Sequence, residues 1–347
     1  MNKHDFVFSI AQLREYLAEK GWDLSRVEKA APWSDHQFNL LIPKYYIDLI
    51  DWYDKHDPLK KMVLTSNLEQ DVQEYEVVDP IGDVCHSPVP GIVHRYPDRC
   101  LLMLTSACAV HCRFCFRKNL LSSSAAHYQK CMEYLKEHTE LWEVILSGGD
   151  PFTFTDAFME KVIKDLRSIS HIKMIRFHTR TPAVYPARIT ESFLAAIGQA
   201  MPYTIVLHIN HPREITAAFI ESVKKFRQTG VLVLSQTVLM KDINNDANTL
   251  EKLFKGLVEI GVKPYYLHHL DAAAGTHHFR TSVEEGKSIM QKLRGNIPGT
   301  CIPEYVIDTP GGYGKIPVFC FQHSKDSLYE ATSFEGKKIV YRDTATI

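Results

Sequence analysis

From about residue 100 onward, short apolar runs alternate with longer amphipathic stretches, and this alternation limits the folds that the chain can adopt. Runs that are apolar throughout are typical of parallel strands buried on both faces. Strands that alternate with helices favour a parallel sheet closed or partly closed into a β/α barrel. Six runs stand out and residues 302–307 add at most one more, so we predict a partial (β/α)6 barrel. The six runs are residues 100–104, 143–146, 173–177, 204–208, 231–234 and 264–268.

The stretches between the runs carry helix start and stop signals. Asp156 stands ahead of one amphipathic stretch, and Asn248 stands ahead of another that Gly261 ends. Ser9 and Gly21 bound a further amphipathic stretch near the N-terminus. No internal repeat or Gly/Ser linker divides the chain. We therefore expect a helical N-terminal extension over residues 1–90, a barrel over 91–320 and a short C-terminal tail over 321–347.

Polar side chains follow each of the six runs. In β/α barrels the reactive groups sit in the loops after the carboxyl ends of the strands. The first run leads into a cysteine-rich loop, the second into SGGD and the third into Arg180. The last three lead into His208, Gln236 and Asp271. One polar residue at a strand end is often a cap, but six in succession indicate an active site.

The segment CAVHCRFC places three cysteines within eight residues. A structural zinc site usually takes two pairs of ligands, and the sequence has no second pair. Three thiolates on a four-iron cube leave one iron without a protein ligand. We interpret Cys108, Cys112 and Cys115 first as ligands of an iron–sulfur cluster, then as a zinc site with His111, and last as buried thiols. The other cysteines have no motif spacing and are interpreted as small buried hydrophobes.

Composition and charge exclude several classes of function. A net charge of −1 gives no global basic field for nucleic acid or anionic membranes. The sequence has no secretory signal, and no apolar stretch approaches the roughly 18 residues of a membrane span. We therefore expect a cytoplasmic enzyme that binds neither membrane nor nucleic acid. In that compartment cysteines are thiols or metal ligands rather than disulfides.

The turn GGYGK at residues 311–315 must be compared with a phosphate-binding P-loop. A P-loop has four residues between its glycines and Ser or Thr after its lysine. Here Thr309 stands at the first glycine position and Ile316 follows Lys315, so the P-loop interpretation fails.

The cysteine triplet after the first strand of a partial barrel resembles the radical S-adenosylmethionine superfamily. In that superfamily the open iron of a [4Fe-4S] cluster binds the amino and carboxylate groups of S-adenosylmethionine. SGGD resembles the glycine-containing segment of the superfamily, where missing side chains let the backbone approach the methionine portion. The resemblance implies cofactor contacts from Ser147, Gly148, Gly149 and Asp150.

Over roughly residues 58 to 318 the sequence resembles the lysine 2,3-aminomutase family. The resemblance rests on SPVPGIVHRYPDR, CRFCFR, HPREIT, PYYLHHLD, HFR and DTPGGYGKIP. It implies that Lys315 forms a Schiff base with pyridoxal 5′-phosphate. Arg95, Tyr96 and Arg99 match contacts to that cofactor, and forked arginine donors suit a phosphate. The matched contacts to S-adenosylmethionine are His208 and Gln236.

The same resemblance implies a substrate. Arg117 matches the ligand of the substrate α-carboxylate, while Asp271 and Asp308 match a carboxylate pair that holds the ε-ammonium of lysine. Apart from the family, two acids on different strand ends suit a compact cation, and an arginine suits a carboxylate. We expect an isomerase that converts L-lysine to β-lysine by 2,3-amino migration. A 5′-deoxyadenosyl radical would start the reaction, with electrons from flavodoxin or ferredoxin.

Some features leave alternatives open. His268 stands where we expect tyrosine in close relatives, so the pyridoxal pocket can differ in detail. HIKMIRFHTR and PARIT resemble shorter relatives that make β-lysine for elongation factor P, which would link the product to that protein and its ligase. Another amino acid substrate, such as glutamate or arginine, fits the acidic pair less well. A metal-stabilised RNA-binding module around HCRFCFRK is the alternative from another class.

Longer members of the family carry a cysteine-rich tail that binds zinc at a subunit interface. The late part of this sequence has only Cys301 and Cys320. We therefore expect no structural zinc of that kind, and a homo-oligomer remains an open alternative.

Overall fold

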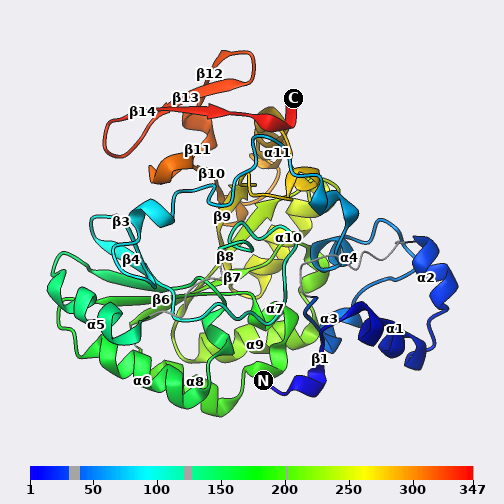
Figure 1. The fold of residues 1–347 in the computed structure, drawn as a ribbon, viewed down its shortest axis with the longest axis horizontal. Helices are drawn as coiled ribbons and strands as arrows, with labels where there is room; N and C mark the ends of the chain where they lie inside the picture. Colours follow the sequence, from blue (N-terminus) through cyan, green and yellow to red (C-terminus); the bar gives the residue numbers. More distant parts are fainter. Residues whose placement is uncertain (31–39, 121–126, 201, 347) are drawn as a thin grey trace.

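The largest element of the computed structural model is a curved, open sheet (Figure 1). The structure describes residues 1–30, 40–120, 127–200 and 202–346, and within these ranges the sheet has nine strands. Strands β4 to β10 run parallel to their neighbours, while β3 and β11 pair antiparallel at the two edges. In spatial order the strands are β3 (Ile92–Tyr96), β4 (Arg99–Leu102), β5 (Glu143–Leu146), β6 (Met174–Thr179), β7 (Tyr203–His208), β8 (Leu232–Leu239), β9 (Lys263–His269), β10 (Glu304–Asp308) and β11 (Lys315–Pro317).

The parallel strands confirm the predicted partial barrel. Each of the six apolar runs lies in one of the strands β4 to β9, and residues 302–307 contribute the seventh parallel strand, β10. The strand order ends at β3 on one side and β11 on the other, so the described sheet does not close. An open barrel exposes the concave face of its sheet at the carboxyl ends of the strands.

The concave face is partly polar. Strands β5 and β7 are buried along nearly their whole length, as expected, whereas β6 and β8 alternate between buried and half-buried residues. In β6, Ile175 and Phe177 are buried in the core, whereas Arg176 and His178 line a cavity. Gln236 of β8 lines the same cavity. Successive side chains of a strand point to opposite faces, and only the helix-covered face needs to be apolar here.

Helices cover the outer face of the sheet (Figure 1). The observed N-caps lie one or two residues before the predicted ones. Thr155 rather than Asp156 caps α6, and Asp246 rather than Asn248 caps α10. Gly261 follows α10 with a φ of 80°, as its role as a stop requires. The helices are α5 (Tyr128–Glu137), α6 (Asp156–Arg167), α7 (Thr181–Val184), α8 (Glu191–Gly198), α9 (Ala217–Gln228), α10 (Ala247–Glu259) and α11 (Val283–Leu293).

Packed phenylalanines join the sheet to its outer helices. The ring of Phe152 lies 4.7 Å from that of Phe193 on α8 and 6.1 Å from that of Phe226 on α9. Phe177 of β6 lies 5.9 Å away on the sheet side. All four are fully buried. Truncating such a residue to alanine typically costs about 3–5 kcal/mol, so this cluster anchors the scaffold behind the polar face.

The N-terminal extension is helical, as predicted, and it supports the cysteine loop. Ser9 caps α1 by accepting a hydrogen bond from the backbone N–H of Gln12. The backbone N–H of Arg113 donates to the carbonyl of Met62 at 2.9 Å, and the Arg113 guanidinium forms a buried ion pair with Glu69. The elements of this part are β1 (Phe6–Val7), α1 (Ile10–Glu19), α2 (Leu24–Ala30), β2 (Ile42–Pro43), α3 (Lys44–Ile47) and α4 (Pro58–Val63).

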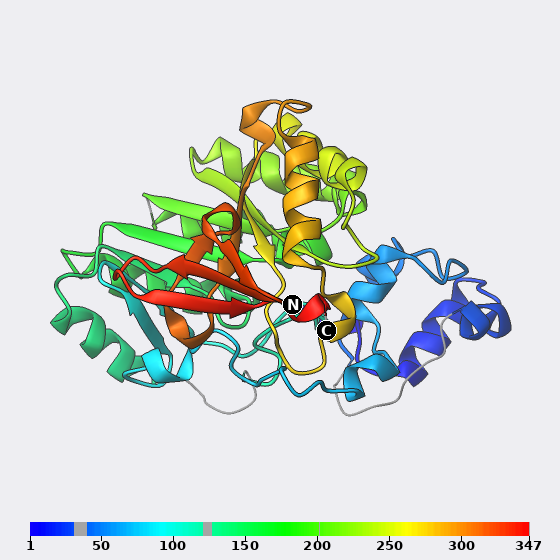
Figure 2. The same cartoon turned by 90° about the horizontal axis from the view of Figure 1, so that it is seen from above.

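The C-terminal segment forms a small antiparallel sheet rather than an irregular tail (Figure 2). Its strands are β12 (Gln322–Lys325), β13 (Leu328–Thr332) and β14 (Lys338–Arg342). Tyr341 is buried, and its hydroxyl accepts a hydrogen bond from Nη2 of Arg280 at 2.8 Å. Between β13 and β14, the ring of Phe334 lies 5.4 Å from that of Tyr96. This segment therefore contacts a residue predicted to bind a cofactor.

Within the described ranges, the helices are all too short or too polar to cross a membrane.

Candidate active site

One cavity of about 480 Å³ brings together most of the predicted site residues. It lies on the concave side of the sheet, and residues from β3 to β11 line it. This volume is typical of a site for small molecules. The predicted residues that line it are Arg95, Tyr96, Arg99, Arg117, Ser147, His208, Gln236, Asp271, Asp308 and Lys315.

The glycine turn before Lys315 needs its glycines for conformation and space. Gly312 and Gly314 have φ values of 81° and 89°, which side-chain-bearing residues rarely adopt. A Cβ atom on Gly312 would lie 2.2 Å from the His86 ring, and one on Gly314 would lie 2.8 Å from the Tyr96 hydroxyl. The backbone N–H of Lys315 donates to that hydroxyl at 2.9 Å. The turn thus places Lys315 against a predicted cofactor residue.

The Lys315 ammonium is paired with one of the predicted substrate carboxylates. Its Nζ lies 2.6 Å from Oδ2 of Asp308. Burial disfavours the charged lysine, but the nearby Asp308 carboxylate outweighs burial and raises the pKa of Lys315. Burial likewise disfavours a charged Asp308, yet Lys315 and Arg95 outweigh it and lower the pKa of that carboxyl. Both groups are therefore charged at neutral pH.

Asp271 is the second predicted substrate carboxylate, and its pKa is shifted in the opposite direction from that of Asp308. Burial and the nearby charge of Asp308 raise the pKa of Asp271 to about 7. Both carboxylates line the cavity, where Lys315 also lies. A second cation brought near this pair would favour the ionised form of Asp271. The acidic pair is thus suited to a positively charged group.

An alternating chain of charges crosses the cavity wall from Lys315 to Arg117. Asp308 accepts from Nη1 of Arg95 at 2.9 Å, and Nη2 of Arg95 lies 3.1 Å from Oδ1 of Asp83. Oδ2 of Asp83 accepts from Nε of Arg117 at 2.7 Å. Asp83 is buried and joins two of the predicted ligand-binding arginines. No sequence motif marks Asp83, because it lies in the N-terminal extension and meets the arginines only in the folded protein.

The three motif cysteines are half-buried, and Cys115 directly precedes Phe116 and Arg117 of the cavity wall. Burial raises the pKa of Cys108 and Cys112, and it raises that of Cys115 to about 11. At Cys108 and Cys115, repulsion from the neighbouring thiolates raises the pKa further. A zinc ion about 2.3 Å from each sulfur would hold the sulfurs roughly 4 Å apart. At least one pair of these sulfurs is farther apart than 4.8 Å, because among the described residues the three cysteines do not form a group with ligand atoms within that distance.

The SGGD segment packs against the start of the cysteine loop. A Cβ atom on Gly149 would lie 2.5 Å from the carbonyl oxygen of Ala107. The backbone N–H of Asp150 donates to the same carbonyl at 2.8 Å. The Asp150 carboxylate is saturated by donors inside the protein, among them the hydroxyls of Thr179 and Thr181. The Asp150 side chain thus braces the loop, and Gly148, Gly149 and Asp150 lie outside the residues that line the cavity.

Buried neutral histidines form another part of the cavity wall. Burial lowers the pKa of His208 and His268 to about 3 each, and it lowers that of His178 well below the usual value. Nε2 of His208 lies 2.8 Å from the amide nitrogen of Gln236, so the two predicted cofactor residues are in contact. Nε2 of His178 and of His268 has no partner among the described residues. These orphaned buried atoms fit a cavity built to receive polar ligands.

No protein-family model matches the sequence. The L-lysine 2,3-aminomutase of Clostridium subterminale is 35% identical over 312 residues, which make up 88% of this chain and 75% of that protein. The L-lysine 2,3-aminomutase of Escherichia coli is 37% identical over 286 residues, or 81% of this chain and 83% of that protein. The glutamate 2,3-aminomutase of Clostridioides difficile is 36% identical over 318 residues, or 90% of this chain and 75% of that protein.

Among solved structures, a radical SAM methyltransferase from Sphaerobacter thermophilus aligns with a TM-score of 0.43 and 19% identity, covering 62% of this chain and 68% of that chain. The sequence matches carry the assignment, because they extend over most of both proteins. They also confirm the resemblance that the cysteine loop and the glycine turn indicate. The chain belongs to the lysine 2,3-aminomutase family.

Proposed function

We propose that the protein is a cytoplasmic isomerase that converts L-lysine to β-lysine by 2,3-amino migration. The cofactors would be a [4Fe-4S] cluster, S-adenosylmethionine and pyridoxal 5′-phosphate. The observation that carries the proposal is the charge chain in the cavity wall, with Lys315 and Asp308 at one end and Arg117 at the other. All eight cysteines are free, in agreement with a reducing compartment.

The residues around the cavity fit these cofactors. The three half-buried cysteines offer the donor set of a cluster with one open iron. Arg95 lines the cavity, and its buried Nε has no partner among the described residues, which suits an anionic phosphate. When bound, the cluster and S-adenosylmethionine supply hydrogen abstraction, and pyridoxal phosphate holds the migrating nitrogen. Lys315 would hold pyridoxal phosphate covalently, while His208 and Gln236 would contact S-adenosylmethionine.

The acidic pair favours lysine over glutamate as the substrate. When Lys315 holds the pyridoxal cofactor, its ammonium no longer neutralises Asp308. Asp308 then keeps its ion pair with Arg95, but the two carboxylates have lost one neutralising cation, so a second ammonium is favoured beside Asp308 and Asp271. The side-chain ammonium of lysine supplies it, whereas a glutamate side chain would bring a third negative charge. Arg117 would orient the α-carboxylate at the other end of the charge chain.

The test is product formation by the reconstituted enzyme. Protein purified without oxygen is supplied with iron, sulfide, pyridoxal phosphate, S-adenosylmethionine and a reductant. L-Lysine and L-glutamate are offered separately, and mass spectrometry follows the β-amino acids. We expect β-lysine and no β-glutamate. β-Glutamate as the main product would overturn the substrate assignment, and the absence of both products from an enzyme that cleaves S-adenosylmethionine would overturn the aminomutase assignment.

The role of Lys315 is tested with two single variants, one at Lys315 and a control at a second lysine. Lys315→Ala should abolish turnover and covalent retention of pyridoxal phosphate while the cluster content stays unchanged. Lys337→Ala removes a lysine on the neighbouring hairpin, which is 59% exposed and pairs with Glu335, and it should retain both properties. Full activity of Lys315→Ala would contradict its assignment as the cofactor lysine.

A further inference from the structure

Strand β3 also carries a side chain that lies outside the cavity lining. Its residues Val93 and Arg95 line the cavity, whereas His94 between them does not. The pairing of β3 with β4 is irregular between Val93 and Tyr96, so the contacts of His94, rather than strand alternation, define where its side chain lies. Its Nδ1 lies 2.7 Å from the hydroxyl of Tyr134 on α5. His94 is therefore held between the sheet and α5, outside the aminomutase site.

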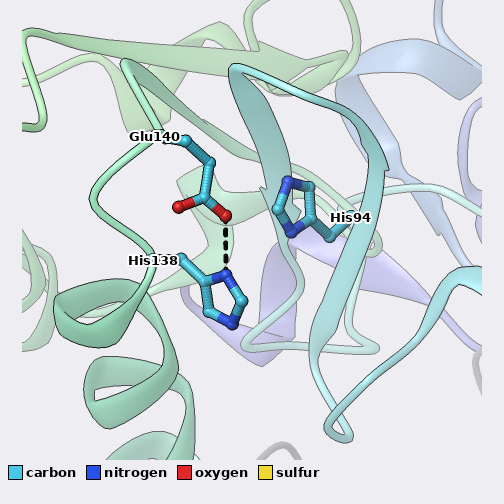
Figure 3. Close-up of side chains that lie close together, drawn as sticks. All are labelled: His94, His138 and Glu140. Carbon is cyan, nitrogen blue, oxygen red and sulfur yellow. Dashed lines mark hydrogen bonds and ion pairs between the residues drawn. The ribbon is translucent and has the colours of Figure 1, made fainter.

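Two further metal-binding side chains reach the same place from the loop between α5 and β5. His138 follows the last residue of α5, and its ring stacks on that of Tyr134 at 3.9 Å. The ring also lies 5.6 Å from that of His94. Nδ1 of His138 lies 2.7 Å from Oε1 of Glu140, and Figure 3 shows the carboxylate and both imidazoles gathered at one point. The site thus joins strand β3 to the loop that leads into β5.

The spacing of these three side chains suits a single metal ion. One ligand atom from each of His94, His138 and Glu140 lies within 4.8 Å of the other two, and no other such group of three occurs among the described residues. Bonds of about 2.0–2.2 Å from zinc to nitrogen and oxygen hold neighbouring ligands roughly 3.3 Å apart. The His138–Glu140 pair is already near that separation, and rotation of the side chains can bring His94 the rest of the way.

The surroundings supply the support and the access that a metal site needs. A metal-bound histidine usually donates its other ring N–H to a fixed partner. The Tyr134 hydroxyl, 2.7 Å from Nδ1 of His94, is a fixed partner that orients this imidazole. The side chains of His138 and Glu140 are 35% and 51% exposed, so an ion can enter from solvent. Two imidazoles and one carboxylate are a donor set that zinc-like divalent ions prefer.

We propose that His94, His138 and Glu140 form a binding site for a divalent transition-metal ion of the zinc class. The ion would tie β3 to the α5–β5 loop. This site is separate from the motif cysteines and from the tail zinc site of longer relatives, and it does not depend on the proposed reaction.

The experiment is a calorimetric titration of Zn²⁺ into protein whose cluster has been reconstituted, so that Cys108, Cys112 and Cys115 are occupied. We expect one tight site in the unmodified protein. His138→Ala and Glu140→Gln should each weaken it about ten-fold or more, as loss of a supporting or direct ligand does at other metal sites. His127→Ala changes an exposed histidine at the opposite end of α5 and should leave the site intact.

A second readout separates this site from other surface histidines. Zn²⁺ that binds the folded state raises the midpoint of thermal unfolding. The increase should occur in the unmodified protein and in His127→Ala, and it should be lost in His138→Ala and Glu140→Gln. The proposal is overturned if the unmodified protein lacks a stoichiometric zinc site, or if the two ligand variants bind zinc as the unmodified protein does.

Discussion

Arg180 donates a hydrogen bond from Nη1 to the Sγ of Cys112 at 3.3 Å. Its Nη2 lies 2.8 Å from Oε1 of Glu214, and both Arg180 and Glu214 are buried. The ion pair fixes the guanidinium beside the sulfur. Positive charge and hydrogen bonds at cluster sulfurs favour the reduced, more negative cluster. Arg180 is therefore placed to raise the reduction potential of a cluster held by Cys112.

Replacement of Arg180 should lower that potential. A hydrogen bond to a charged group is worth about 1.5 kcal/mol, which corresponds to roughly 60 mV for one electron. Arg180→Gln should therefore shift the midpoint potential of the reconstituted cluster downward by about 60 mV, as measured by a redox titration followed by electron paramagnetic resonance. Glu214→Gln keeps the guanidinium and should produce a smaller shift. Equal potentials in Arg180→Gln and the unmodified protein would argue against this role.

The raised pKa of Asp271 predicts a pH-dependent effect on stability. The unfolded chain releases this proton near pH 4, whereas the folded protein holds it up to about pH 7. Between these values the folded state binds more protons, so this group makes the protein less stable as pH rises. Asp271→Asn removes the charge and should raise the free energy of unfolding at pH 8 by up to about 4 kcal/mol, because the shift is about three pKa units and one unit corresponds to about 1.4 kcal/mol.

The measurement is urea denaturation of the Asp271 variant and the unmodified protein at several pH values, without substrate. The two stabilities should approach a constant difference as pH falls below 4, where Asp271 becomes protonated in both states. A constant difference between pH 4 and pH 8 would mean that the Asp271 charge does not cause it.

Asp83 should act as a positioning residue for Arg117. Asp83→Asn weakens the ion pairs that join Arg95 and Arg117 through Asp83. The Arg117 guanidinium, which we propose binds the substrate carboxylate, then loses its fixed orientation. We expect KM for lysine to rise about ten-fold, with a smaller change in kcat, because the Arg117 guanidinium would contribute to binding of the substrate in its ground state. Asp242→Asn removes a 64% exposed carboxylate that pairs with Lys61 outside the cavity lining, and it should leave KM unchanged. A loss of kcat alone would contradict the positioning role.

The sequence predicts the architecture well, because its signals are local. The apolar runs and the loops that follow them place Lys315, Asp308 and Gln236 correctly around one cavity. The role of Asp150 could not be predicted from the sequence. Its hydrogen bonds go to residues about 30 positions away, and these depend on how neighbouring strands align. The sequence pattern gives the position of a carboxylate but not which donors surround it.

Long-range pairings explain what the sequence could not predict. Asp83 lies 34 residues from Arg117, and no periodicity or motif relates them. His94 and His138 likewise meet only because α5 returns the chain to the edge of the sheet. The polar face of β6 was visible in principle, because Arg176 and His178 alternate with apolar residues at the period of a strand. Reading alternation within each run would have revealed it.

The glycine turn offers a test of how conformation and space combine to hold Lys315. Gly312→Ala places a side chain at a φ of 81° and a Cβ atom 2.2 Å from the His86 ring. Gly295→Ala is the matched control, because its φ is 82° and a Cβ atom there would have no neighbour within 4 Å. The left-handed conformation alone costs about 1–2 kcal/mol, so both variants should lose that much stability in urea denaturation. Gly312→Ala should lose more, because His86 must move, and it should also retain less pyridoxal phosphate on Lys315. If both variants lost the same stability and both kept the cofactor, the packing of His86 against the turn would not be what positions Lys315.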